Sequence, residues 1–115
     1  MEATRTHIPT DVHSAVHRWG PLALGDAGDA VEVTASVIRT VQTSGEFGDN
    51  GRVVIEGSVD GVEYVALNDS MGLPLAIGGP RIRTIADAVR FVRPHVVDGD
   101  ATTAIAVQLL TRAQP

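Results

Sequence analysis

Residues 53–67 read VVIEGSVDGVEYVAL, and they carry the clearest structural signal in this 115-residue chain. Two runs rich in Val, Ile and Tyr flank the pair Asp60-Gly61, which is a preferred sequence for a two-residue type I′ turn. Both central residues of such a turn need a positive φ, which glycine adopts freely and aspartate tolerates better than most residues. The stretch therefore predicts a β-hairpin that reverses at Asp60-Gly61.

The composition favours one domain built from sheets. A chain of this length can bury a single hydrophobic core but not two cores and a linker. Hydrophobic residues make up 43% of the chain and aromatic residues only 3%, so Val, Ile, Leu and Ala must build the core. Val and Ile pack well on a pleated surface, and 12 Gly and 6 Pro supply turns. We therefore expect an all-β protein.

Charge and cysteine content exclude several kinds of site. The net charge is −5, which argues against nucleic acid as a partner, because that affinity comes largely from clustered cations. The chain has no Cys and hence no disulfide, thiolate nucleophile or cysteine-ligated zinc. No run approaches the roughly 20 apolar residues of a membrane span, and no signal peptide is evident. We expect neither a nucleic-acid partner nor a membrane partner.

Residues 1–29 differ from the remainder, and we expect them to form an extended N-terminal arm and a loop. They show no strand alternation, and they hold three of the four His, the only Trp and the small-residue run GDAGD at 25–29. The β-sandwich domain is expected over residues 30–115. Its first strand is predicted over 31–42, where a bend near 36–39 could divide the strand between two sheets.

Two later runs also have strand character. Pro94 lies inside the run 89–97 and cannot donate to a ladder, so that strand is expected at an edge or at a bulge. The run 103–111 places Ile105, Val107 and Leu109 on one face. Short strands with turns every eight to twelve residues or so predict an antiparallel, jelly-roll-like β-sandwich.

No metal or cofactor site is expected. His13 and His17 have the spacing of two zinc ligands on one helical face, but no third ligand accompanies them, so exposed histidines on an arm are the better interpretation. Asp98 and Asp100 could present carboxylates to Ca²⁺, but the EF-hand pattern is absent.

No active site is expected either. The G-x-S-x-G context of a serine nucleophile is absent, and no His has an evident orienting carboxylate. We predict that the protein is not an enzyme.

Two groups of residues are candidate partner interfaces. Arg81, Arg83, Arg90 and Arg93 lie close together in the sequence and form either a solvated face with salt bridges or a docking surface for an acidic partner. The second group surrounds a tryptophan, the residue type most enriched at binding hot spots. This cluster either anchors in a neighbour's pocket or packs over the end of its own sandwich, and it consists of Trp19, Pro21, Leu22 and Leu24.

The hairpin resembles that of galactose-binding-like (discoidin-type) jelly rolls, which reads I-x-x-S-x-D-G-x-x-W/Y-x-x-L. Residues 55–61 (IEGSVDG) and Leu67 match it, with Tyr64 where that hairpin often has Trp. A wider likeness, from about Val31 to Leu110, is to small virion proteins of tailed phages. The corresponding segments here are GEFG at 45–48, EGSVDG at 56–61, FVRP at 91–94 and GDATT at 99–103, with Phe91 where those proteins have Tyr.

The phage resemblance implies a capsid decoration (cement) protein. Such a protein is a β-sandwich that binds the major capsid protein on the outer surface of the virion and bridges neighbouring capsomers. It needs no active site and tolerates an acidic surface. An oligomer, dimer or trimer, would suit the lattice. The alternative is a carbohydrate-binding or tail-associated, receptor-reading β-sandwich, which the scarcity of aromatic residues disfavours.

Overall fold

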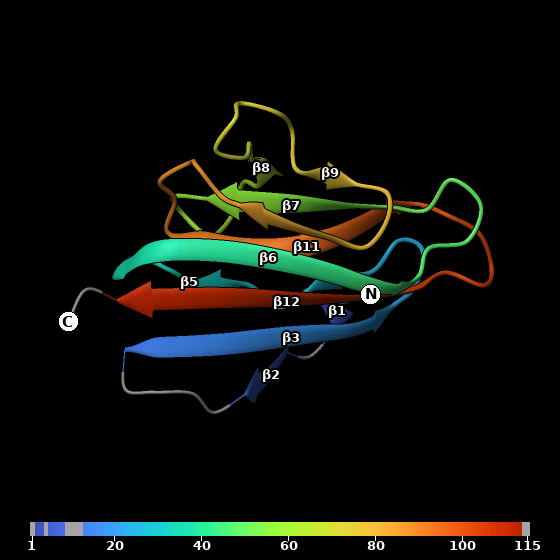
Figure 1. Ribbon diagram of the computed structural model, residues 1–115, viewed down its shortest axis with the longest axis horizontal. Helices are drawn as coiled ribbons and strands as arrows, with labels where there is room; N and C mark the ends of the chain where they lie inside the picture. Colours follow the sequence, from blue (N-terminus) through green and yellow to red (C-terminus); the bar gives the residue numbers. More distant parts are fainter. Residues whose placement is uncertain (1, 4, 9–12, 114–115) are drawn as a thin grey trace.

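Two β-sheets pack face to face and form a sandwich (Figure 1). The computed structural model describes residues 2–3, 5–8 and 13–113, and this part contains no helix long and apolar enough to cross a membrane. Sheet A consists of β1 (Glu2–Ala3), β4 (Ala27–Gly28), β5 (Val31–Glu32), β7 (Arg52–Ser58), β8 (Val65–Ala66), β9 (Ala76–Ile77) and β11 (Phe91–Asp98). Sheet B consists of β2 (Arg5–Ile8), β3 (Ser14–Leu22), β6 (Ser36–Glu46), β10 (Arg81–Thr84) and β12 (Ala104–Ala113).

The pairing of strands is almost entirely antiparallel. The order in sheet A is β1-β4-β11-β7-β8, with β5 also on β11 and β9 also on β7. The order in sheet B is β10-β6-β12-β3-β2. Only the pairing of β1 with β4 is parallel among the described strands. The expected antiparallel β-sandwich is confirmed.

The core lies between the sheets and is aliphatic apart from two aromatic rings. Alternation along β12 buries Ile105, Val107 and Leu109 completely, as the sequence predicts. They belong to one cluster with residues of both sheets, whose largest members include Trp19, Leu22, Ile55, Leu67, Leu75 and Ile77.

The expected N-terminal arm is wrong for residues 14–28, because they belong to the sandwich. β3 pairs with β12 along its length, and the side chain of Trp19 is only 1% exposed. The indole N–H of Trp19 donates to the Asp29 carbonyl at 2.8 Å, and a side chain on Gly28 would overlap the indole ring. The expected boundary between residues 29 and 30 falls between β4 and β5, which lie in the same sheet.

The predicted division of the strand at residues 31–42 is confirmed, although the break comes slightly earlier than expected. β5 belongs to sheet A and β6 to sheet B, and residues 33–35 join them. The Ser36 N–H donates to the Val33 carbonyl at 2.9 Å and closes the turn between the sheets. The chain therefore crosses the sandwich in three residues.

The expected edge position of Pro94 is wrong, because β11 has partners on both sides. The Val96 N–H donates to the Asp26 carbonyl, so the nitrogen of Pro94, two residues earlier, faces the same side of the strand. On that side β5 pairs only with residues 91–92 and β4 only with His95. The missing N–H of Pro94 therefore leaves no backbone hydrogen bond of the sheet unmade.

The predicted hairpin is confirmed, but its two-residue turn is wrong. β7 and β8 pair through Glu56 with Ala66 and Gly57 with Val65, which leaves a connection over residues 59–64. Gly61 has a φ of 80°, whereas Asp60 does not adopt a positive φ.

Two side chains organise this wider loop. The Ser58 hydroxyl accepts the Gly61 N–H at 2.8 Å and donates to Asp60 Oδ1. Asp60 Oδ1 also accepts the N–H groups of Val62 at 2.8 Å and Glu63 at 3.0 Å. Local bonds from Ser and Asp to the backbone therefore replace the tight turn.

Replacing Trp19 with alanine should reduce the free energy of unfolding by about 3–5 kcal/mol, because it removes a buried aromatic side chain and leaves a cavity. Urea denaturation followed by circular dichroism measures the change. Leu24→Ala is the control: its side chain is 49% exposed, so a change within about 0.5 kcal/mol is expected. Equal effects of the two substitutions would contradict the buried position of Trp19.

The loop also predicts an unusually acidic carboxyl group. The N–H groups of Val62 and Glu63 and the Ser58 hydroxyl lower the pKa of Asp60 to about 2. Because this pKa is depressed in the folded protein, the stabilising contribution is complete above about pH 4 and is lost as the pH falls toward 2. An NMR titration of the Asp60 carboxyl carbon should give a midpoint near 2, and a midpoint near 3.8 would contradict the loop geometry.

Candidate protein-interaction face

The outer surface of sheet B, which we term the sheet B face, is broad and open. Cross-strand register places Val16, Leu110 and Thr40 in one row across β3, β12 and β6. The adjacent row contains Arg18, Gln108, Gln42 and Ile82, and extends to β10. Ile82 is 66% exposed and Leu110 is 38% exposed, so the face offers apolar side chains to solvent.

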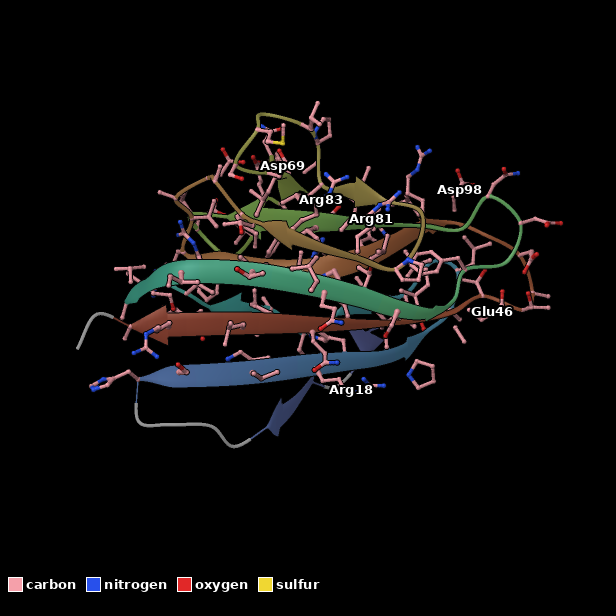
Figure 2. All side chains as sticks on the ribbon, in the orientation of Figure 1. Arg18, Glu46, Asp69, Arg81, Arg83 and Asp98 are labelled. Carbon is pink, nitrogen blue, oxygen red and sulfur yellow. The ribbon has the colours of Figure 1, made fainter. Side chains whose placement is uncertain are left out.

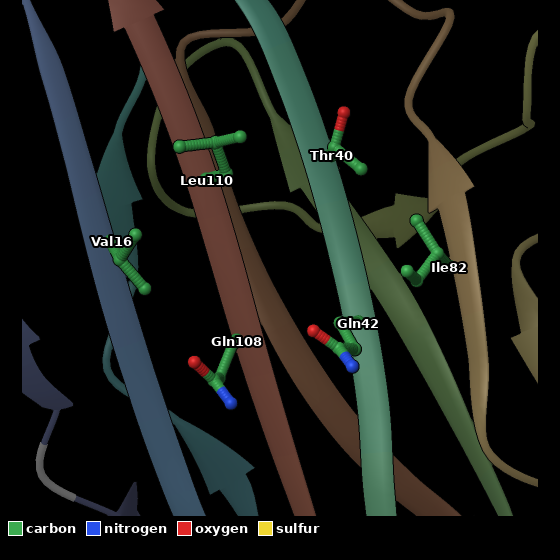
Figure 3. A pocket seen from close by; sticks show the side chains of 6 residues that line it. All are labelled: Val16, Thr40, Gln42, Ile82, Gln108 and Leu110. Atoms are coloured by element: carbon green, nitrogen blue, oxygen red, sulfur yellow. The ribbon is translucent and has the colours of Figure 1, made fainter.

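A shallow groove crosses this face. Its first part has a volume of about 280 Å³ and is lined by Val16, Thr40, Gln42, Ile82, Gln108 and Leu110 (Figure 3). A second, more open hollow of about 470 Å³ shares Gln42 and Ile82 and continues to Pro80 and Arg81. The groove thus runs from β3 to the edge strand β10.

Two glutamines lie at the centre of the groove. Gln42 and Gln108 are directly opposite each other on β6 and β12. Figure 3 shows both side-chain amides on the same surface, between Val16 and Ile82. Within the described residues, no hydrogen bond is made by either side-chain amide. Each amide can donate and accept, so the pair can bond the peptide groups of a partner.

The described side chains on the strands of sheet B include five Arg and one carboxylate, Glu46. Two of these arginines, Arg18 and Arg112, lie on the sheet B face. The other three pair in register with buried residues and lie on the opposite side of the sheet; they are Arg39, Arg81 and Arg83. Glu46 lies at the end of β6 and accepts the N–H of Gly48. Arg18 and Arg112 flank the groove on β3 and β12. Arg81, on the edge strand β10, borders the second hollow (Figure 2).

Contrary to the prediction, the Trp19 cluster does not form an exposed interface. Trp19 and Leu22 are 1% and 0% exposed and pack in the core, so their role in a partner interface is wrong. A bulge in β3, between the pairs Trp19–Val107 and Leu22–Ile105, brings Leu22 inward in place of Pro21. Pro21 and Leu24 are exposed.

The expected basic patch is divided among separate ion pairs. Arg83 pairs with Asp69 at 2.7 Å, Arg90 with Glu32 at 2.9 Å and Arg93 with Glu56 at 3.0 Å. Arg81 and Arg83 lie on β10 of sheet B, whereas Arg93 lies on β11 of sheet A. The salt-bridge interpretation therefore holds for three of these arginines, and Arg81 borders the groove.

The structure places neither His13 with His17 nor Asp98 with Asp100 in a cluster of metal ligands. His17 is a buried residue of β3 and His13 directly precedes that strand, so about 13 Å of extended chain separates them. Hydrogen bonds to the Asp100 carboxylate lower its pKa; the Thr102 hydroxyl has the largest effect, and the N–H groups of Asp49 and Thr102 add to it. The described residues contain no cluster of three or more His, Asp or Glu that could hold a metal.

The outer face of sheet A carries a different polar network. Arg93 donates a hydrogen bond to one carboxylate oxygen of Glu56, and the second oxygen of Glu56 lies 3.2 Å from His95 Nδ1. The guanidinium of Arg93 stacks 3.9 Å from the centre of the Tyr64 ring, and that of Arg90 lies 5.0 Å from the Phe91 ring. Since Phe47 and Trp19 are buried, each Phe, Tyr and Trp ring among the described residues is either buried or lies against an arginine.

Comparison with solved structures shows a shared fold. The SPBc2 prophage-derived protein YomS is similar with a TM-score of 0.62 and 13% identity, over 90% of this chain and 98% of that chain. A cupin domain from Bordetella pertussis Tohama I has a TM-score of 0.53 and 12% identity, over 97% and 95% of the two chains. No protein-family model and no curated protein sequence matches the chain. The similarity, at these identities, is one of fold.

The opposite orientations of Leu109 and Leu110 give a direct test of the two faces. Leu109 is 0% exposed, so Leu109→Ala should lower the free energy of unfolding by about 2–5 kcal/mol. Leu110 lies in the groove, so Leu110→Ala should cost less than about 1 kcal/mol. Urea denaturation compares the two variants, and a larger loss for Leu110→Ala would contradict the described register.

Proposed function

We propose that this chain is a non-enzymatic structural protein of a bacteriophage particle. In this proposal it decorates the outer surface of the capsid, contacts the major capsid protein and stabilises the shell by bridging neighbouring capsomers. The shared fold with a prophage-derived protein supports a phage origin. The four sequence segments that resemble those of small virion proteins support the specific role in decoration.

The sheet B face is the observation that carries the proposal. It is an open surface with exposed aliphatic side chains, two glutamine amides that make no hydrogen bond within the described residues, and a groove of about 280 Å³. Exposed apolar side chains gathered on a regular element are typical of surfaces that bind another protein. The face rests on β12, which pairs with strands on both sides, so little ordering is needed when a partner binds.

Decoration would act through many modest contacts. A protein at a junction of the lattice ties several subunits together, so opening one subunit requires breaking contacts with its neighbours. Association of the chain into a dimer or trimer is part of the proposal, because an oligomer presents several copies of the binding surface at once. No chemical step is required of any residue.

The carbohydrate-binding alternative has less support. Sugar binding by a β-sandwich module commonly uses exposed aromatic rings, and binding proteins place such rings as flat contact surfaces. Here Trp19 and Phe47 are buried, and arginines stack on Tyr64 and Phe91. The geometry therefore favours a protein partner.

Co-sedimentation with phage heads tests the proposal. Heads of the encoding phage, assembled without this protein, should bind the purified full chain in a saturable manner. Heads that already carry the protein should bind no more. The full chain is needed because residues 14–22 form β3. Absence of binding to undecorated heads, together with binding to a glycan array, would favour the carbohydrate-reading alternative.

A further inference from the structure

We infer that copies of this chain associate head to tail, with the tip of the β8–β9 loop of one copy seated in the sheet B groove of the next. The tip consists of residues 69–73, and Met71 is its anchor. The inference rests on the proposed function only in that association of copies is part of that function. It identifies the two surfaces that meet.

The tip projects from the sandwich and exposes apolar side chains. It lies in the connection between β8 and β9, which stands clear of the strands at the top of Figure 1. Met71 is 82% exposed and Leu73 is 53% exposed. Apolar side chains gathered on a projecting loop are typical of a contact with another protein.

The carboxylate of Asp69 holds the tip in shape. Its Oδ1 accepts the N–H groups of Met71 at 2.9 Å and Leu73 at 3.0 Å, and its Oδ2 accepts a hydrogen bond from Arg83 of β10 at 2.7 Å. The Asp69 N–H donates to the Leu73 carbonyl at 2.8 Å. Because the loop is already ordered by these bonds, it loses little conformational freedom on binding, and the anchor side chain is preorganised.

The tip can be buried without burying an unpaired charge. Asp69 is the only charged residue of the tip, and it pairs with Arg83. The loop over residues 59–64 also exposes two valines. That loop carries two carboxylates, however, Asp60 and Glu63, and neither forms an ion pair within the described residues. Their burial would be costly, so the tip is the better anchor.

The sheet B groove matches the tip in its apolar lining. Its volume is about 280 Å³, and its walls include the aliphatic side chains of Val16, Ile82 and Leu110. A methionine side chain is unbranched and flexible, so it adapts to an irregular apolar surface of this kind. The groove can therefore receive the anchor side chain of a second copy.

The polar groups of the two surfaces also match. The amides of Gln42 and Gln108 lie at the centre of the groove (Figure 3). Within the described residues, the backbone carbonyls at positions 70–72 accept no hydrogen bond. The amides can donate to these carbonyls, so both sides of the contact gain the hydrogen bonds that buried polar groups require.

The contact is heterologous, because the tip and the groove lie on different sides of the molecule. In Figure 1, β3, β6 and β12 of sheet B lie in front of the strands of sheet A, and the tip projects above them. One copy can therefore offer its groove to one neighbour and its tip to another. Such a contact gives a closed ring where the rotation between copies closes, and an open filament where it does not.

Complementation between two variants tests the inference. Met71→Glu places a charge on the tip and leaves the groove intact, whereas Ile82→Glu places a charge in the groove and leaves the tip intact. Measured by sedimentation velocity, each variant alone should show a dissociation constant for self-association at least about tenfold above that of the wild type, because the contact would bury an unpaired carboxylate.

An equimolar mixture of the two variants should regain a single contact. The intact tip of the Ile82→Glu variant fits the intact groove of the Met71→Glu variant, and no third copy can join. The expected species is a complex with one copy of each variant. A symmetric contact of one patch with itself would give no such recovery, since every copy would carry the same altered patch as before.

Val37→Glu is the matched control. Val37 is 58% exposed and lies at the start of β6, outside both the tip and the residues that line the groove. This substitution should leave the dissociation constant for self-association unchanged within about twofold, because it lies outside the contact. Circular dichroism and thermal melting establish that each variant is folded.

The outcomes separate this inference from capsid attachment. A wild type that stays monomeric, two variants that self-associate like the wild type, or a mixture that forms no complex would each overturn the inference. Co-sedimentation with undecorated heads is a separate measurement. Absence of head binding by the wild type, with recovery of the complex in the mixture, would overturn capsid attachment and leave the inference intact.

Discussion

The indole of Trp19 joins the two sheets, and much of the sandwich depends on it. Trp19 lies on β3 opposite Val107 of β12, while its ring packs on Gly28 of β4 in the other sheet. Its N–H donates to the Asp29 carbonyl, so the polar atom of this buried side chain is satisfied. A larger residue at position 28 would displace the ring. One side chain therefore sets the spacing between β3 and the start of sheet A.

β12 could be predicted from the sequence because three aliphatic residues mark its inward face. Ile105, Val107 and Leu109 alternate without interruption, and β12 follows that alternation. β3 could not be predicted in the same way, because His17 occupies an inward position and a bulge near Gly20 interrupts the period of two. The sequence of this strand therefore resembled that of an irregular arm.

Tertiary context also determined which candidate residues came together. Of the four arginines between residues 81 and 93, two lie on β10 of sheet B, one lies on β11 of sheet A and Arg90 directly precedes β11. Carboxylates pair with three of them. The sheet B face instead combines outward positions of β3, β6, β10 and β12, which lie far apart in the sequence. The only local signal of this face is the alternation of outward and inward positions along each strand. Which strands lie side by side cannot be read from such a pattern, since strand pairing depends on the whole fold.

The short link between β5 and β6 has a mechanical consequence. Residues 33–35 join a strand of sheet A directly to a long strand of sheet B, and the Ser36 N–H donates a hydrogen bond to the Val33 carbonyl. A pull on sheet B would therefore pass along the covalent chain into sheet A within a few residues. The ladders of β12 with β3 and β6 would share the same load in shear. A sandwich connected in this way would carry tension from one sheet to the other through the covalent chain as well as through the core.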